Sequence, residues 1–108
     1  MPDRSFRMEQ LQFVWDEEKA RLNVAKHGIR FETAAFVFMD ALRLEQLDAK
    51  HSTAAEIRYI TIGMVHDILT VVYCERGDDA DPCIRLISAR QATPREKALY
   101  NNAMYGRY

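Results

Sequence analysis

The sequence predicts an α+β domain, in which an antiparallel sheet has helices packed against it in the order β-α-α-β-β-β-α. Three observations carry this prediction. Capping residues mark a helix near the N-terminus and another near the C-terminus, and three strand-like runs lie between them, two of which are rich in Ile, Val, Tyr and Thr. With 108 residues, the chain is expected to form a single domain over residues 1–108.

The first elements are defined by helix start and stop signals. Residues 1–10 are polar and lack a period, which favours a loose arm, whereas residues 11–15 alternate as a short strand does. Asp16 is a good N-cap before two acidic residues, where the helix dipole favours negative charge, and Gly28 is a typical C-terminal stop. A helix is therefore expected at about 17–27.

A second helix is expected at about 32–39, because four apolar residues follow a helical spacing: Phe31, Ala34, Ala35 and Phe38. Residues 40–55 have mixed polarity and favour an irregular connection, with a short strand near 42–47.

The central runs, 57–65 and 68–75, predict a hairpin with His66-Asp67 as a two-residue turn. This turn would place Arg58 directly opposite Glu75, on the same face of the sheet.

A Gly/Asp/Pro loop follows at 76–83, and residues 84–90 then form the third strand of this sheet. Thr93 as N-cap, Pro94 at the first helical position and Glu96 as partner in a capping box start the last helix.

Bulk composition excludes several classes of protein. The net charge is −1, which disfavours binding of nucleic acid by bulk positive charge but leaves room for a local basic cleft. Cys74 and Cys83 fit no zinc pattern, and no cofactor or metal is expected. A transmembrane span and a secretory signal are not expected either, so the simplest location is the cytoplasm.

Ionic side chains gather at the ends of the predicted elements, an arrangement suited to holding a phosphodiester. The candidates are Lys26, His27, Glu56, Arg58, Glu75, Arg85 and Arg90. Arginine offers a planar, permanently charged fork for phosphate, and histidine can transfer protons near neutrality. The alternatives are that His27 caps its helix and that the arginines form structural ion pairs with Glu56 or Glu75. His51 and His66, in a connection and a turn, are expected to be solvated.

The chain resembles a known family through sequence blocks that stand in order over about residues 13–100. The blocks are W-D-x-x-K from Trp15, K-H-G from Lys26, R-x-I-S-A-R from Arg85 and E-x-x-x-Y from Glu96. It resembles the BrnT family, toxins of bacterial type II toxin–antitoxin pairs. The resemblance implies a RelE-like fold, a ribonuclease that inhibits translation, and a BrnA-like antitoxin. A heterotetramer of two toxins and two antitoxins is expected, which would repress its own operon through DNA contacts of the antitoxin.

Two positions depart from the family pattern. The loop at 78–83 is longer and more acidic than is usual, and Arg30 stands where a serine or similar cap is common. The acidic loop lies near the expected RNA face and therefore bears on substrate preference.

Metal-free RNA cleavage uses the 2′-hydroxyl as nucleophile and needs an acceptor for its proton, a donor for the leaving oxygen and cations for the phosphorane. His27 is the best placed histidine by sequence, Lys26 and the arginines would bind phosphate, and a desolvated Glu56 or Glu75 would serve as base. The competing hypothesis is a catalytically inactive binding module that acts only within a DNA-binding repressor complex. The near-zero net charge and the acidic loop favour it.

Overall fold

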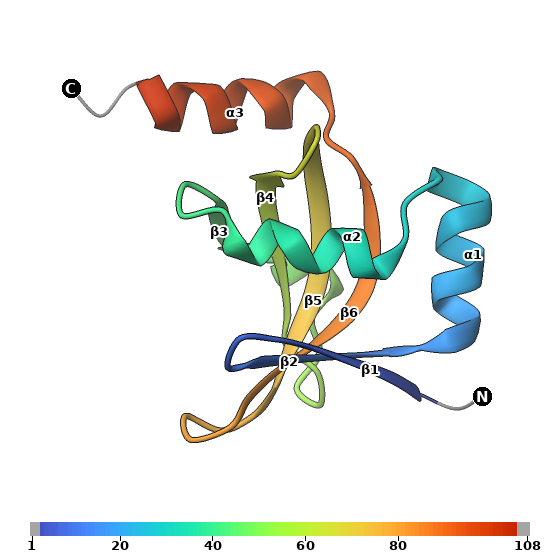
Figure 1. Cartoon of the computed structure of the whole chain (residues 1–108). Helices are drawn as coiled ribbons and strands as arrows, with labels where there is room; N and C mark the ends of the chain where they lie inside the picture. Colours follow the sequence, from blue (N-terminus) through green and yellow to red (C-terminus); the bar gives the residue numbers. More distant parts are fainter. Residues whose placement is uncertain (1–2, 106–108) are drawn as a thin grey trace.

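The computed structural model describes residues 3–105, which form one mixed six-stranded sheet with three helices (Figure 1). The strand order is β1-β2-β6-β5-β4-β3. The strands are β1 (Asp3–Met8), β2 (Leu11–Asp16), β3 (Leu44–Leu47), β4 (Arg58–Met64), β5 (Ile68–Gly77) and β6 (Pro82–Gln91). The α+β class is confirmed, as is the short strand expected near 42–47.

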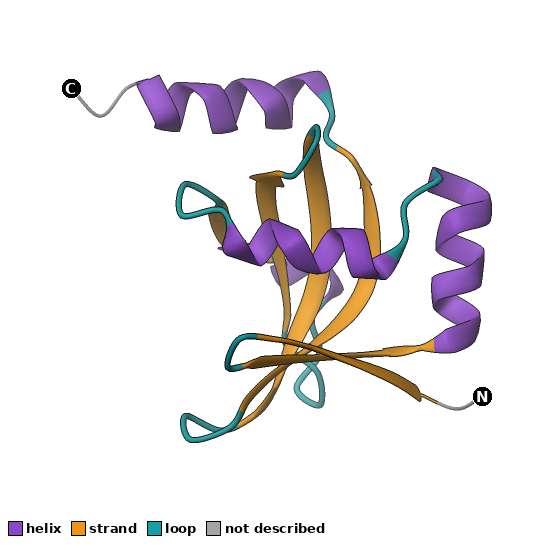
Figure 2. Ribbon diagram, viewed as in Figure 1, coloured by secondary structure: helices purple, strands orange, loops and turns teal. Residues whose placement is uncertain are grey.

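The helices lie on different sides of this sheet. Helix α2 (Phe31–Ala35), extended by the 3₁₀ turn η1 (Phe36–Met39), crosses in front of β4, β5 and β6. Figure 2 shows α1 (Glu17–His27) beside β6 and α3 (Pro94–Tyr105) across the upper end of the strands. A second 3₁₀ turn, η2 (Ala49–His51), lies in the connection from β3 to β4.

The helix caps predicted from the sequence are confirmed. The backbone N–H of Glu18 donates to the Asp16 carboxylate at 2.9 Å, and Gly28 ends α1 with φ of 72°. Thr93 and Glu96 form the reciprocal capping box, with N–H···O distances of 2.8 and 3.2 Å. These contacts are local, which is why sequence spacing predicts them.

The prediction that residues 1–10 form a loose arm is wrong for the part that the structure describes. Residues 3–8 form β1, which pairs antiparallel with β2 from Asp3↔Asp16 to Met8↔Leu11. Most side chains of β1 face solvent, so its polar sequence lacks the apolar alternation by which a strand is recognised. Its order comes from the ladder with β2 rather than from an apolar face of its own.

The sheet is mixed, so the prediction of a purely antiparallel sheet is also wrong. Strand β2 runs parallel to β6, but only Gln12, Phe13 and Val14 pair with it, opposite residues 83–85. Among residues 3–105, the upper part of β6 therefore has no strand neighbour on that side. The side chain of Asn23 occupies this edge and exchanges hydrogen bonds with the backbone of Ala89.

The β4–β5 hairpin forms as expected, but its register differs by one residue. Met64 pairs with Ile68, so the turn contains three residues, and Val65 N–H donates to the carbonyl of Asp67 at 3.0 Å. Arg58 consequently lies opposite Cys74 rather than Glu75. Strands β5 and β6 also extend further than expected, which shortens the loop between them to residues 78–81.

The main core lies between the sheet and α2. Fully buried members include Phe13, Phe31, Val37, Tyr73 and Leu86. Tyr73 points to this face, where its ring meets Phe38 edge-on at a centroid distance of 4.9 Å. Because side chains alternate along a strand, Cys74 and its cross-strand neighbours point to the opposite face.

Candidate functional site

Three arginines from three adjacent strands share the sheet face opposite α2. Arg58 of β4 pairs with Cys74 of β5, and Cys74 pairs with Arg85 of β6. Directly paired residues project to the same face, and Arg76, two residues beyond Cys74, does so as well. We call Arg58, Arg76 and Arg85 the arginine face. Strand spacing places the Cα atoms of Arg58 and Arg85 about 10 Å apart.

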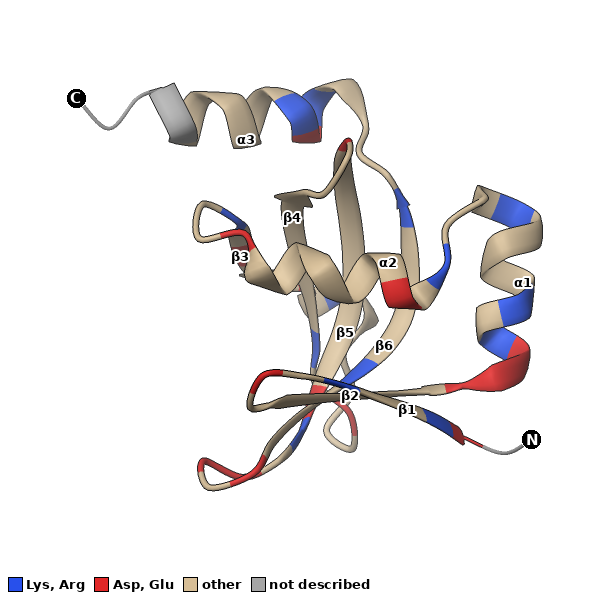
Figure 3. Ribbon diagram, viewed as in Figure 1, with Lys and Arg blue, Asp and Glu red and all other residues tan. Residues whose placement is uncertain are grey.

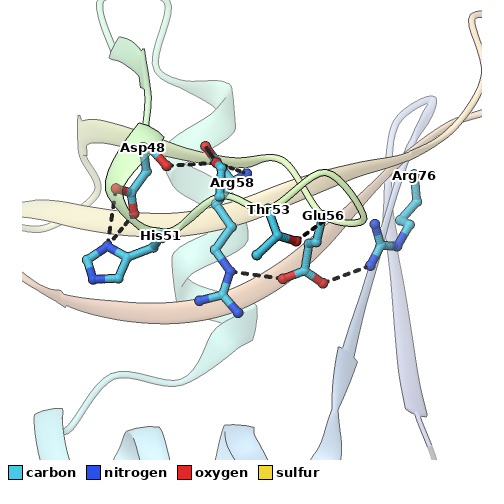
Figure 4. Close-up of polar contacts among 7 residues, drawn as sticks. Asp48, His51, Thr53, Glu56, Arg58 and Arg76 are labelled. Atoms are coloured by element: carbon cyan, nitrogen blue, oxygen red, sulfur yellow. Dashed lines mark hydrogen bonds and ion pairs between the residues drawn. The ribbon is translucent and has the colours of Figure 1, made fainter.

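A single carboxylate joins two of these arginines. Glu56 accepts from Arg58 Nε at 2.9 Å and from Arg76 at 3.3 Å, so it lies between the two guanidinium groups (Figure 4). Its hydrogen bond with Arg58 is the main cause that lowers the pKa of Glu56. Glu56 therefore stays ionised at neutral pH and fixes the direction of both guanidinium groups.

Arg85 is held by a carboxylate from the N-terminal strand. Its two terminal nitrogens donate to Asp3 at 3.0 and 3.2 Å, which is the two-pronged geometry that guanidinium forms with carboxylate or phosphate. This contact is the main cause that raises the pKa of Arg85 and lowers that of Asp3. Asp3 is exposed, so an incoming phosphate can compete with it.

Cys74 lies beneath these charges and is fully buried. Burial raises the pKa of its thiol, which therefore remains protonated at neutral pH. A buried neutral thiol is a poor nucleophile, so Cys74 acts as a small apolar spacer between the arginines.

Arg90 belongs to a different cluster. It donates to Glu96 at 2.7 and 3.0 Å, and Glu96 also accepts from Thr70 at 3.0 Å. Thr70, which pairs with Arg90, lies four residues from Cys74 along β5, or about 13 Å at the strand rise. The structure therefore gives Arg90 an ion pair at the foot of α3 and separates it from the arginine face.

Lys26 and His27 end α1 at the outer edge of β6. They line a groove that reaches Ile87 and Ser88 of β6. Arg85 lies three residues further along this strand from Ser88, about 10 Å away. Lys26 and His27 therefore border the open sheet face on its β6 side. A catalytic role for His27 stays a prediction.

Glu75 lies on the other face of the sheet. It alternates with Cys74 and lines a pocket with Arg43 and Tyr73 on the α2 side. The predicted cross-strand pair of Arg58 with Glu75 is wrong, because the three-residue turn shifts the register and Arg58 pairs with Glu56 instead.

The connection between β3 and β4 holds His51, which the sequence analysis expected to be solvated and did not count among the candidates. His51 is 60% exposed, yet its Nδ1 lies 3.0 and 3.2 Å from the two oxygens of Asp48, whose side chain is only 10% exposed. In Figure 4 the imidazole lies on the same side of this loop as the Arg58 guanidinium. The spacing Asp-x-x-His was the available signal, but a polar connection gives no period to mark it.

Acidic residues of the β5–β6 loop lie at one end of the arginine face. The β5–β6 loop is red in Figure 3 and continues from the strand that carries Arg76. Arg7 of β1 approaches Asp81 of this loop at 3.4 Å. Within residues 3–105, no group of three or more His, Cys, Asp or Glu side chains is arranged to hold a metal ion.

Residues 15–96 match the model of a protein family described as the ribonuclease toxin BrnT of type II toxin–antitoxin systems. The chain belongs to the BrnT family. Its function is thus that of a ribonuclease toxin with an antitoxin partner. No curated protein matches the sequence. The matched span includes every candidate residue from Lys26 to Arg90 and begins after β1, so Asp3 lies outside it.

None of the helices in the described part of this BrnT chain combines the length and apolarity needed to cross a bilayer.

Proposed function

We propose that this BrnT chain is a metal-independent endoribonuclease that binds RNA on the arginine face and inhibits translation in the cytoplasm. The observation that supports it is the cross-strand row of Arg58, Cys74 and Arg85, with Arg76 beside it. Three guanidinium groups on a rigid sheet supply the cations that a phosphorane needs.

The carboxylates beside these arginines fit the same proposal. Glu56 and Asp3 neutralise two of the three positive charges, which keeps the free protein folded without strong self-repulsion. A phosphate of RNA would replace Asp3 on Arg85, while Glu56 keeps Arg58 and Arg76 in position. Binding then depends on shape and local charge rather than on the net charge of the chain.

For partners, we propose a BrnA-like antitoxin and a complex of two toxins with two antitoxins. Operator DNA would be bound through the antitoxin, and the complex would repress its own operon. The α+β sheet with an open face is compatible with a RelE-like arrangement. A partner that covers the arginine face with acidic side chains would block RNA by occupying the same cations.

The test is RNA cleavage by the purified chain in the presence of EDTA, followed by mass spectrometry of the product ends. We expect 2′,3′-cyclic phosphate and 5′-hydroxyl ends, and a loss of cleavage of about 10²-fold or more in R58A and R85A. The matched control is R21A, which removes an exposed arginine paired with Glu18 on α1.

Growth of a bacterial host completes the test. Induced expression should stop growth, and co-expression of the antitoxin gene should restore it. A folded wild-type protein that neither cleaves RNA nor slows growth would refute the proposed endoribonuclease activity. Such a result would support the binding module, which the neutralised arginines and the acidic loop otherwise favour.

A further inference from the structure

We propose that His51, oriented by the buried Asp48, is the side chain that accepts the 2′-hydroxyl proton during RNA cleavage on the arginine face. This inference rests on the proposed ribonuclease function. It assigns the proton transfer to the β3–β4 connection rather than to the end of α1.

The geometry of the pair is that of an oriented general base. Both carboxylate oxygens of Asp48 lie within 3.2 Å of His51 Nδ1, so this nitrogen carries the hydrogen that Asp48 accepts. Nε2 is then the nitrogen left for substrate, on a ring that is 60% exposed. A nearly buried carboxylate that holds Nδ1 fixes the tautomer and the direction of the ring, which leaves Nε2 to take the proton.

The loop that carries His51 is fastened to the residue that starts the arginine face. Asp48 N–H donates to the Arg58 carbonyl at 2.9 Å, and Arg58 N–H donates to Ser52 Oγ at 2.8 Å. Ser52 Oγ in turn donates to the Asp48 carbonyl at 2.7 Å. This closed set of bonds sets the position of the imidazole relative to Arg58, as Figure 4 shows.

Other proton acceptors are placed less well. Glu56 is bound by Arg58 and Arg76, which lower its pKa and make it a weak base. His27 lies at the outer edge of β6, and β5 separates β6 from the strand that carries Arg58. His66 is in the turn at the opposite end of β4.

The chemical step balances with these groups. The 2′-oxygen attacks the adjacent phosphorus, the P–O2′ bond forms, and its proton moves to His51 Nε2. The P–O5′ bond breaks, and the leaving oxygen takes a proton from solvent water. The products are a 2′,3′-cyclic phosphate and a 5′-hydroxyl, and the imidazolium returns its proton to solvent. Arg58 and Arg85 stabilise the negative charge of the phosphorane.

The decisive variant is H51Q, because a side chain that is largely exposed can be replaced without loss of the fold. Single-turnover cleavage of a short fluorescent RNA should fall by about 10²- to 10⁴-fold. Affinity for the same RNA with a 2′-deoxy residue at the scissile position should remain within about twofold, since His51 acts on the proton. H66Q, a matched change at an exposed turn, should cleave as the wild type does.

Two further measurements separate proton transfer from a structural role. Added imidazole should restore part of the cleavage in H51A, which a structural histidine would not allow. D48N should lower kcat with little change in KM, because Asp48 is a positioning residue.

The outcomes distinguish the two proposals. A wild type that does not cleave RNA refutes the proposed function itself. A wild type that cleaves, together with an H51Q variant that cleaves equally well, overturns only the role of His51. In that case a loss of cleavage in H27Q would show that His27, at the end of α1, accepts the 2′-hydroxyl proton.

Discussion

Replacing Asn23 by alanine should strongly destabilise this protein, although Asn23 is a polar residue on a helix. Asn23 is buried in α1, and its amide nitrogen donates to the carbonyls of Ile29 and Ala89 at 2.9 and 2.8 Å. Its side-chain oxygen accepts from Ala89 N–H at 3.1 Å. One side chain thereby satisfies the edge of β6 where β2 no longer pairs, and it fastens α1 to the sheet.

The magnitude follows from the groups that the N23A variant would leave without partners. Three buried backbone groups lose a hydrogen bond, and each such loss costs about 1–3 kcal/mol. We expect a loss of about 3–5 kcal/mol in the free energy of unfolding. This is a large share of the roughly 5–15 kcal/mol that stabilises a typical domain. For a chain of this size the melting temperature should fall by about 15–25 °C.

The assay is urea unfolding followed by circular dichroism, with N102A as control. Asn102 is exposed on α3, so its replacement should change stability by less than about 0.5 kcal/mol. If N23A cost less than about 1 kcal/mol, the idea that Asn23 acts as a substitute strand partner for β6 would be wrong.

Two further predictions concern charged residues that the structure pairs. Hydrogen bonding to Arg90 lowers the pKa of Glu96 from 4.5 to about 2, so its stabilisation is present above pH 4.5 and is lost as the pH falls toward 2. E96Q should therefore flatten the acid dependence of the unfolding free energy by up to about 3 kcal/mol, whereas E32Q, at an exposed pair, should not. D3N should free Arg85 to bind phosphate and so tighten RNA binding. The slope of the logarithm of the RNA association constant against the logarithm of the salt concentration should become steeper by about 0.7, which corresponds to one more phosphate contact. An unchanged slope in a salt titration would show that Arg85 does not meet phosphate.

The parts of the fold that depend on neighbours in sequence could be predicted. The caps at Asp16, Gly28 and Thr93 act within one helical turn, so their residue types suffice to place α1 and the start of α3. The hairpin of β4 and β5 was predictable from composition, but its register was not. A turn of three residues instead of two depends on how Val65 and Asp67 bond, which propensity does not specify.

Contacts between distant segments could not be predicted from patterns. Strand β1 is polar and is ordered by β2, and the parallel contact of β2 with β6 joins segments about seventy residues apart. The same limit applies to the site. Glu56 and Arg58 are close in sequence and were identified together, whereas the contact of Arg85 with Asp3 required the fold.

The division of the candidate residues has a consequence for how catalysis would be organised. Arg76 and Arg85 project from the middle strands of a sheet whose opposite face is packed against α2, so their backbone has little freedom. His51 lies in a loop, and its position depends on the hydrogen bonds that join Asp48 and Ser52 to Arg58. The phosphate-binding arginines and the base therefore lie on different elements, which meet at the backbone of Arg58. Changes in the loop should then alter the rate of cleavage alone, whereas changes in the sheet should alter RNA affinity as well as the rate, and the H51Q and R85A variants measure this difference directly.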